Sequence, residues 1–217
     1  MMAISDERLA RVEEGLAMLR TLMFDPAGAF ESLKDAPLRQ AFSFYLRLLV
    51  VFAVLFAAIA ATIPHFLTQL PEVFPDAQTF LMLFAPMIDI IVRTPPLLIF
   101  GGVFVALLFG GIVGMLISAV WLHIWVYAFG GRQGFKQTLK AYMLGMTPFL
   151  VLGWIPIINI FGAIWAILAV LNGIMQLHDM YSGAAILALL VSLLIPGVAA
   201  LAAMPVAMPH LVGVMGW

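Results

Sequence analysis

The sequence contains no cysteine and few charged residues, and both absences limit what the protein can be. Without cysteine the chain forms no disulfide and no thiolate metal site. Only 10% of the residues are charged, 65% are hydrophobic and the mean hydropathy is +1.14, whereas soluble globular domains are roughly 25% charged and 45–50% apolar. A formal net charge of -1 gives no overall positive field that would favour nucleic acid. The composition predicts an integral membrane protein.

Catalytic motifs are also absent. The sequence has no Gly-x-Ser-x-Gly, no His-Glu-x-x-His and no cysteine nucleophile. Its adjacent acids Glu13 and Glu14 fall in a stretch that is predicted to be a helix outside the bilayer. We therefore predict no catalytic residues, no cofactor and no resident metal, and a protein that is not an enzyme.

Residues 1–39 are predicted to form a cytoplasmic amphipathic region, and residues 40–217 a membrane domain. Ser5 and Asp25 suit helix N-caps, and Pro26 suits a first helical position. We expect two short helices within residues 5–36. The first carries an apolar stripe at helical spacing, formed by Leu9, Val12, Leu16, Leu19 and Met23.

The membrane domain is predicted to be an all-α bundle of five spans. About 20 apolar residues cross a ~30 Å hydrocarbon core, and glycines and prolines divide the longer apolar runs. The third span is short, so a half-depth hairpin is an open alternative there. Residues 80–92 are apolar but too short to span, which is typical of interfacial or re-entrant segments. The five spans are placed at about 41–63, 97–129, 138–153, 157–177 and 184–204.

The distribution of cations predicts the orientation. Five Lys or Arg residues precede the first span, three lie between the second and third, and none follows Lys140. Because cytoplasmic loops are enriched in Lys and Arg, we expect a cytoplasmic amino terminus and a carboxyl terminus outside. The predicted location is a prokaryotic cell membrane.

A polar island, "FGGRQGFKQTLKAY", lies between the second and third spans. It resembles a phosphate-binding loop only loosely, because its lysine does not follow a glycine and no strand precedes it. We interpret it as a cytoplasmic turn. Its cations attract anionic lipid at about 1 kcal/mol each near a membrane surface. The candidates for contact with lipid or a partner are Arg132, Lys136 and Lys140.

Polar side chains near or within the spans have structural and functional interpretations. Asp89 and Arg93 are spaced for an ion pair within one helix. A stripe on the fourth span either bonds across helices or lines a path for an ion or a polar headgroup. A minor hypothesis places a metal between His123, His178 and Asp179. The stripe consists of Asn172, Gln176 and Asp179.

Small residues recur every four positions on the second span. Such stripes let helix backbones approach closely in lipid, so we expect this one to pack within the bundle or in a dimer. The alternative is that these glycines only loosen the helix. The stripe consists of Gly102, Ala106, Gly110, Gly114 and Ser118.

The chain resembles the Yip family, the Ypt/Rab-interacting multispanning membrane proteins, in a compact prokaryotic form. The resemblance rests on "MFDPAGAFESLKDAP" and on the long stretch from "HIWVYAFGGRQGFKQ" to "LHDMYSGAAILALLV", and it covers most of residues 22–200. It implies five membrane helices, a cytoplasmic amino terminus and no known enzymatic site. Eukaryotic relatives are associated with small GTPases and vesicle traffic. This chain lacks their long amino-terminal tail and its Asp-Leu-Tyr-Gly-Pro-type stretch.

The leading functional hypothesis is a non-enzymatic membrane organiser that meets lipids or protein partners and self-associates through small-residue faces. The second hypothesis is a transporter, channel or lipid-translocating protein that uses the polar stripe on the fourth span.

Overall fold

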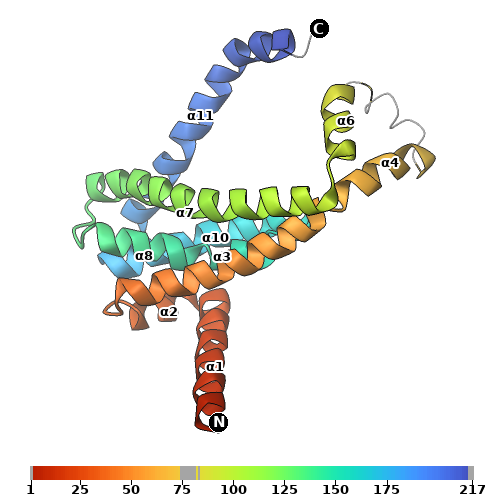
Figure 1. Ribbon diagram of the computed structural model, residues 1–217. Coiled ribbons are helices and arrows are strands. Elements are labelled where there is room, and N and C mark those ends of the chain that lie inside the picture. Colours follow the sequence, from red (N-terminus) through yellow and green to blue (C-terminus); the bar gives the residue numbers. More distant parts are fainter. Residues whose placement is uncertain (1, 74–81, 83, 215–217) are drawn as a thin grey trace. The chain divides into compact units, whose positions relative to one another are not determined.

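All the regular structure that the computed structural model describes is α-helical (Figure 1). The description covers residues 2–73, 82 and 84–214. The predicted all-α class is confirmed over these ranges. The helices are α1 (Met2–Phe24), α2 (Pro26–Ser32), α3 (Leu38–Ala60), α4 (Ile63–Val73), α6 (Ala85–Arg93), α7 (Pro96–Ala128), α8 (Phe135–Gly145), α9 (Thr147–Leu152), α10 (Ile158–His178) and α11 (Ser182–Val214).

Four helices of the described chain are long and apolar enough to cross a membrane. They are α3, α7, α10 and the Ser182–Ala199 part of α11. Each contains at least 18 apolar-rich residues, close to the roughly 20 that a bilayer core requires. The predicted count of five spans is not confirmed by these helices, because the region of the third predicted span is divided.

The division lies between α8 and α9, and a proline explains it. Pro148 stands in the first turn of α9 and has no backbone N–H to bond the carbonyl four residues earlier. That carbonyl belongs to Leu144, and the Thr147 hydroxyl donates to it instead at 2.6 Å. One continuous helix is therefore not formed over 138–153.

The described chain forms two compact units. The first comprises residues 1–52 and 110–195, and the second comprises residues 53–109 and 196–217. In the second unit α4 packs against α6, and the predicted ion pair on α6 is confirmed, with Arg93 Nε 2.7 Å from Asp89 Oδ1. Residues 80, 81 and 83 of the predicted interfacial segment lie outside the described residues. The predicted domain boundary after residue 39 concerns the membrane and stays a prediction.

The core of the first unit is built on a close approach of α8 and α10. A Cβ built at Gly145 would lie 2.7 Å from the Val170 Cα atom, so only glycine fits between the two backbones. At Gly173 a Cβ would lie 3.0 Å from the Ala141 Cα atom and 2.9 Å from Phe30 Cζ. Two glycines thus set how closely the helices pack.

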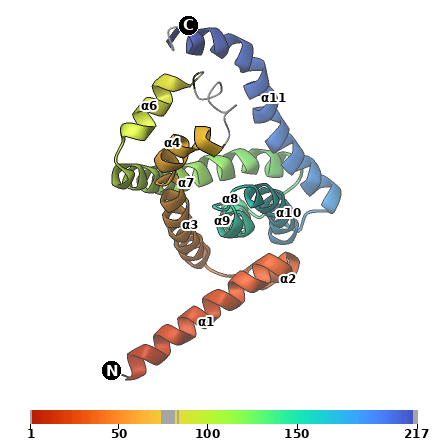
Figure 2. The ribbon, with the colours of Figure 1, turned by 90° about the vertical axis from the view of Figure 1, so that its right-hand side faces the viewer.

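The two amino-terminal helices form an arm, here defined as α1 and α2. Asp25 caps α2 as predicted, with its Oδ1 atom accepting from the Gly28 N–H at 3.1 Å, and Pro26 opens the helix. The predicted cap at Ser5 is wrong, because α1 already begins at Met2. Phe30 is fully buried where α2 packs on α10, while the amino-terminal end of α1 extends away (Figure 2).

Candidate functional site

A buried lysine holds the arm on the membrane helices. Backbone carbonyls of the turn that follows α2 need hydrogen-bond donors when they are buried, and Lys140 of α8 supplies them. The Lys140 ammonium donates to the carbonyl oxygens of Leu33 at 3.1 Å, Lys34 at 2.7 Å and Ala36 at 3.0 Å. All three of its donors are therefore used.

The environment of Lys140 makes this contact a structural one. The residue is only 4% exposed. A buried charge is costly unless hydrogen bonds replace its hydration. The three carbonyls supply those bonds.

An exposed polar cluster lies beside this lysine and ties the arm to the end of α10. Lys34 Nζ pairs with Asp179 Oδ1 at 2.5 Å, and Gln133 Nε2 donates to Asp179 Oδ2 at 3.0 Å. Gln137 Nε2 donates to the Lys34 carbonyl at 3.2 Å. The hydrogen bond from Lys34, rather than burial, lowers the pKa of the Asp179 carboxyl. We call the five residues the arm anchor: Lys34, Gln133, Gln137, Lys140 and Asp179.

The backbone presents Asp179 to this cluster. Asp179 ends α10 with φ 52° and ψ 38°, a left-handed conformation that aspartate adopts more readily than most residues. The sequence singled out Asp179 and Lys140, but it did not indicate that Lys34 would meet Asp179 or that Lys140 would meet the turn after α2. Helical spacing relates residues within one element, and these contacts join residues more than a hundred positions apart.

The histidines of the minor metal hypothesis form a hydrogen-bonded chain with a threonine. His123 Nδ1 lies 2.7 Å from Thr138 Oγ1, which lies 2.9 Å from His178 Nε2. Asp179 is turned toward Lys34 instead. Within the described ranges no three His, Cys, Asp or Glu side chains gather closely enough to hold a metal ion. The hypothesised group of His123, His178 and Asp179 is not assembled.

The three residues of the predicted polar stripe on α10 are not hydrogen-bonded to one another in the observed contacts. The Asn172 side-chain amide donates to the Leu168 carbonyl of its own helix at 2.9 Å. Gln176 is half-buried, and Asp179 belongs to the arm anchor. Whether these residues line a polar path stays a prediction.

The three cations of the polar island have different surroundings. Lys140 is buried in the arm anchor. The Arg132 guanidinium stacks over the Tyr127 ring, 4.2 Å from its centre, and also donates to the Tyr127 carbonyl. Lys136 is exposed. Contact with lipid or a partner stays a prediction for all three, and the exposed residues available for it are Arg132 and Lys136.

The small-residue stripe on α7 is open within each compact unit. No atom lies within 4 Å of a Cβ built at Gly102, Gly110 or Gly114. Ala106 is exposed and Ser118 is half-buried. Buried positions of α7 lie beside this stripe and beyond it: Met115 and Ala119 are one position after Gly114 and Ser118, and Leu122 and Val126 continue the four-residue spacing past Ser118. Packing through the predicted stripe stays a prediction, and the open face leaves it available to a second copy.

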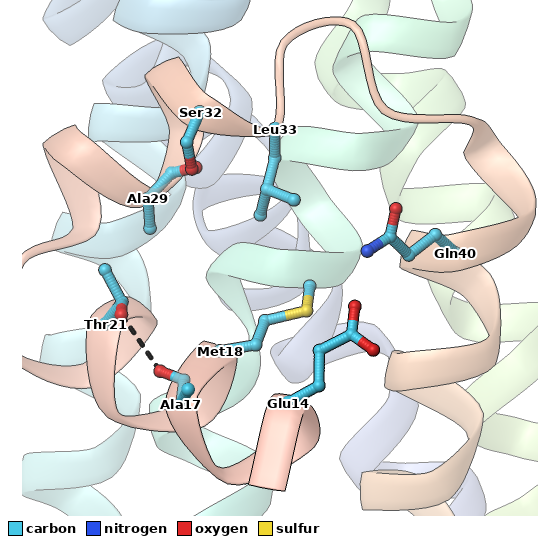
Figure 3. A pocket seen from close by; sticks show the side chains of 8 residues that line it. All are labelled: Glu14, Ala17, Met18, Thr21, Ala29, Ser32, Leu33 and Gln40. Carbon is cyan, nitrogen blue, oxygen red and sulfur yellow. Dashed lines mark hydrogen bonds between the residues drawn. The ribbon is translucent and has the colours of Figure 1, made fainter. Parts of the chain in front are cut away.

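A pocket lies between the arm and the start of α3 (Figure 3). It measures about 250 Å³. The side chains of Met18, Leu33 and Gln40 point into it, and the Glu14 carboxylate lies at its edge. The Thr21 hydroxyl already donates its proton to the Ala17 carbonyl at 2.9 Å, so it could only accept a hydrogen bond from a molecule in the pocket. We call this cavity the arm pocket.

Comparison with known proteins gives one match. The family model described as the Yip1 domain matches residues 20–204, which include α2, the arm anchor and all four long apolar helices. No curated protein matches the chain. No solved structure matches it either.

Proposed function

The chain belongs to the Yip1 domain family, and from that premise we propose that it is a non-enzymatic organiser at the cytoplasmic face of a prokaryotic membrane. Family membership and long apolar helices make it a membrane protein. In the proposed role the arm binds a protein partner, and the membrane helices fix where that partner is held.

The observation that carries this proposal is that the arm is anchored and yet presents unburied apolar side chains. Val12 and Leu16 of α1 are 58% and 59% exposed, and Phe24 is 75% exposed. An exposed apolar group costs free energy in water, and patches of them mark interaction sites. The arm pocket lies on another side of α1 and adds polar groups, among them Glu14 and Gln40, that would give specificity.

The proposed topology has five crossings, with α8 and α9 together making the fifth. These helices cover residues 135–152, about 27 Å at ~1.5 Å per residue. They run antiparallel to α10 along its length, which supports a crossing of similar depth. The neighbouring pairs are Thr138 with His178, Ala141 with Gly173, Gly145 with Val170, and Leu152 with Gly162.

Five crossings place the two ends of the chain on opposite sides, with the arm in the cytoplasm. Because the chain has no cysteine, single cysteines can report each side. We expect a cysteine at Gln133 to react only from the cytoplasm and one at Leu201 only from outside. A half-depth α8–α9 hairpin would instead put both positions on one side.

Self-association is proposed through the open small-residue face of α7. Close backbone approach across such a face is favourable in lipid. Val113 is half exposed beside Gly114, so a photo-crosslinker there should give an adduct of two chains. Its absence from intact membranes would remove this part of the proposal.

The transport alternative takes second place because its polar groups have local partners. Asn172 bonds its own helix and Asp179 bonds the arm. If the chain moves ions or headgroups, replacing Asn172 and Gln176 by leucine should abolish flux in proteoliposomes. Unchanged flux in that variant would end the alternative.

The organiser proposal is tested by a photo-crosslinking amino acid at Leu16 in intact membranes. We expect a discrete adduct with a protein partner, and a weaker one when Val12 is also changed to Asp. The matched control is Glu31, which is exposed on α2 outside the arm pocket and should give no adduct. Finding no adduct at Leu16, or equal adducts at both positions, contradicts the proposal.

A further inference from the structure

A second cavity of the first compact unit is built differently from the arm pocket. It is a groove of about 420 Å³ between α3, α7 and α8, a volume within the range of small-ligand sites. Its walls are almost wholly apolar and include Phe42 of α3, Leu116 of α7 and Met143 of α8. All three helices belong to the first compact unit over these residues.

One cation lines this otherwise apolar groove. Arg39, in the first turn of α3, is part of its wall and is exposed. No described carboxylate lies within ion-pair distance of Arg39, whereas the nearby Lys34 is paired with Asp179. Its guanidinium is therefore available to an anion, and guanidinium groups bind phosphate in a bidentate manner.

A second cation stands one helical turn beyond the groove wall on α8. Lys136 precedes the lining residue Leu139 by three positions, so the two share a face of α8. Lys136 is exposed. Lys140, the third cation at this level, is already engaged by three carbonyls. Arg39 and Lys136 thus both stand near the groove, and neither has an ion-pair partner among the side chains that the structure describes.

This combination of an apolar slot and a charged end matches one class of ligand. An acyl chain fits an apolar wall open to lipid, and an anionic phosphate headgroup fits exposed Arg and Lys side chains at the membrane surface. We infer that the α3–α7–α8 groove is a binding site for an anionic phospholipid, with Arg39 as the headgroup contact and Lys136 as a supporting charge. A zwitterionic lipid would fill the slot without gaining the full charge interaction.

The test is native mass spectrometry of the full chain in micelles that contain equal amounts of phosphatidylglycerol and phosphatidylcholine. We expect the wild-type protein to retain phosphatidylglycerol preferentially. Arg39→Gln should lower this preference about fivefold, the effect of one cation near a membrane surface. Arg132→Gln removes the same charge from the polar island outside the groove, and should leave the preference nearly unchanged.

A second variant tests the slot itself. Leu116 is partly exposed, so Leu116→Trp should fill the groove without disturbing the core, and retention of both lipids should fall. Thermal unfolding midpoints equal to that of the wild type show that each variant is folded. Equal losses in Arg39→Gln and Arg132→Gln would mean diffuse surface attraction only. Unchanged retention in Leu116→Trp would mean that no lipid chain occupies the groove, and either result overturns the inference.

Discussion

Two glycine-bearing regions of this protein differ both in sequence pattern and in how closely their glycines are packed. On α7, small residues recur every four positions, yet Gly110 and Gly114 face open space. Between α8 and α10, Gly145 and Gly173 belong to no regular repeat, yet each lets a helix backbone approach its neighbour. A repeat shows which residues share a helix face. It does not show which face meets another helix.

The largest expected effect comes from closing the α8–α10 contact. Gly145→Ala would place a methyl group 2.7 Å from backbone atoms of Val170. A change of side-chain rotamer cannot relieve this clash, because the atoms involved belong to the backbone. We expect the free energy of unfolding to fall by about 3 kcal/mol, at the upper end for overpacked cores. Denaturant or thermal unfolding in detergent measures it.

Gly114→Ala is the matched control for this comparison. It adds the same methyl group to a helix at an open position, and alanine is favoured over glycine within helices by roughly 0.5–1 kcal/mol. Stability should therefore stay level or rise slightly. Equal losses in the two variants would mean that the two glycines are not packed differently.

Lys140 and Lys136 of α8 differ in the same way, one being buried and the other exposed. Replacing the buried one should lower the free energy of unfolding by somewhat less than Gly145→Ala. Lys140→Met keeps the side chain's length but leaves three carbonyls without their charged donor. Hydrogen bonds to charged groups contribute about 1.5–3 kcal/mol, so we expect a loss of about 2 kcal/mol and faster proteolysis of the arm. Lys136→Met, at an exposed position, should change stability by no more than about 0.5 kcal/mol. A protease-resistant arm in Lys140→Met would show that Lys140 does not hold it.

These two pairs show how far the sequence could be read. Composition and hydrophobic length predicted the all-α membrane class, and Asp25 and Pro26 predicted the start of α2, because these are local properties. Within the site, Lys140 and Asp179 were singled out only as members of local patterns. Their partners could not be predicted, because Lys34 and the carbonyls after α2 reach them through the tertiary fold. The division of the third predicted span followed from Pro148, a signal that was present in the sequence.

The smallest expected effect concerns the exposed ion pair of the arm anchor, whose two charges solvent screens. The folded-state pKa of Asp179 is lowered chiefly by the hydrogen bond from Lys34. Its contribution is therefore present above the ordinary carboxyl pKa of roughly 3.9, and it is lost as the pH falls through the lower folded-state value. Asp179→Asn should have a lower unfolding midpoint than the wild type at pH 6, and the difference should narrow progressively as the pH is lowered below the ordinary carboxyl pKa. If the difference in unfolding midpoint did not change with pH, the Asp179 charge would not be its cause.

A distance between α2 and the end of α10 shows whether Lys140 fixes the arm to α8 and α10. Glu31 on α2 and Tyr181 after α10 are both exposed, and the chain has no other cysteine to interfere. Spin labels on cysteines at these positions, in lipid bilayers, report their separation by pulsed electron paramagnetic resonance. We expect one narrow distance distribution that broadens in Lys140→Met and stays narrow in Lys136→Met. A broad distribution in the protein with Lys140 intact would contradict the account.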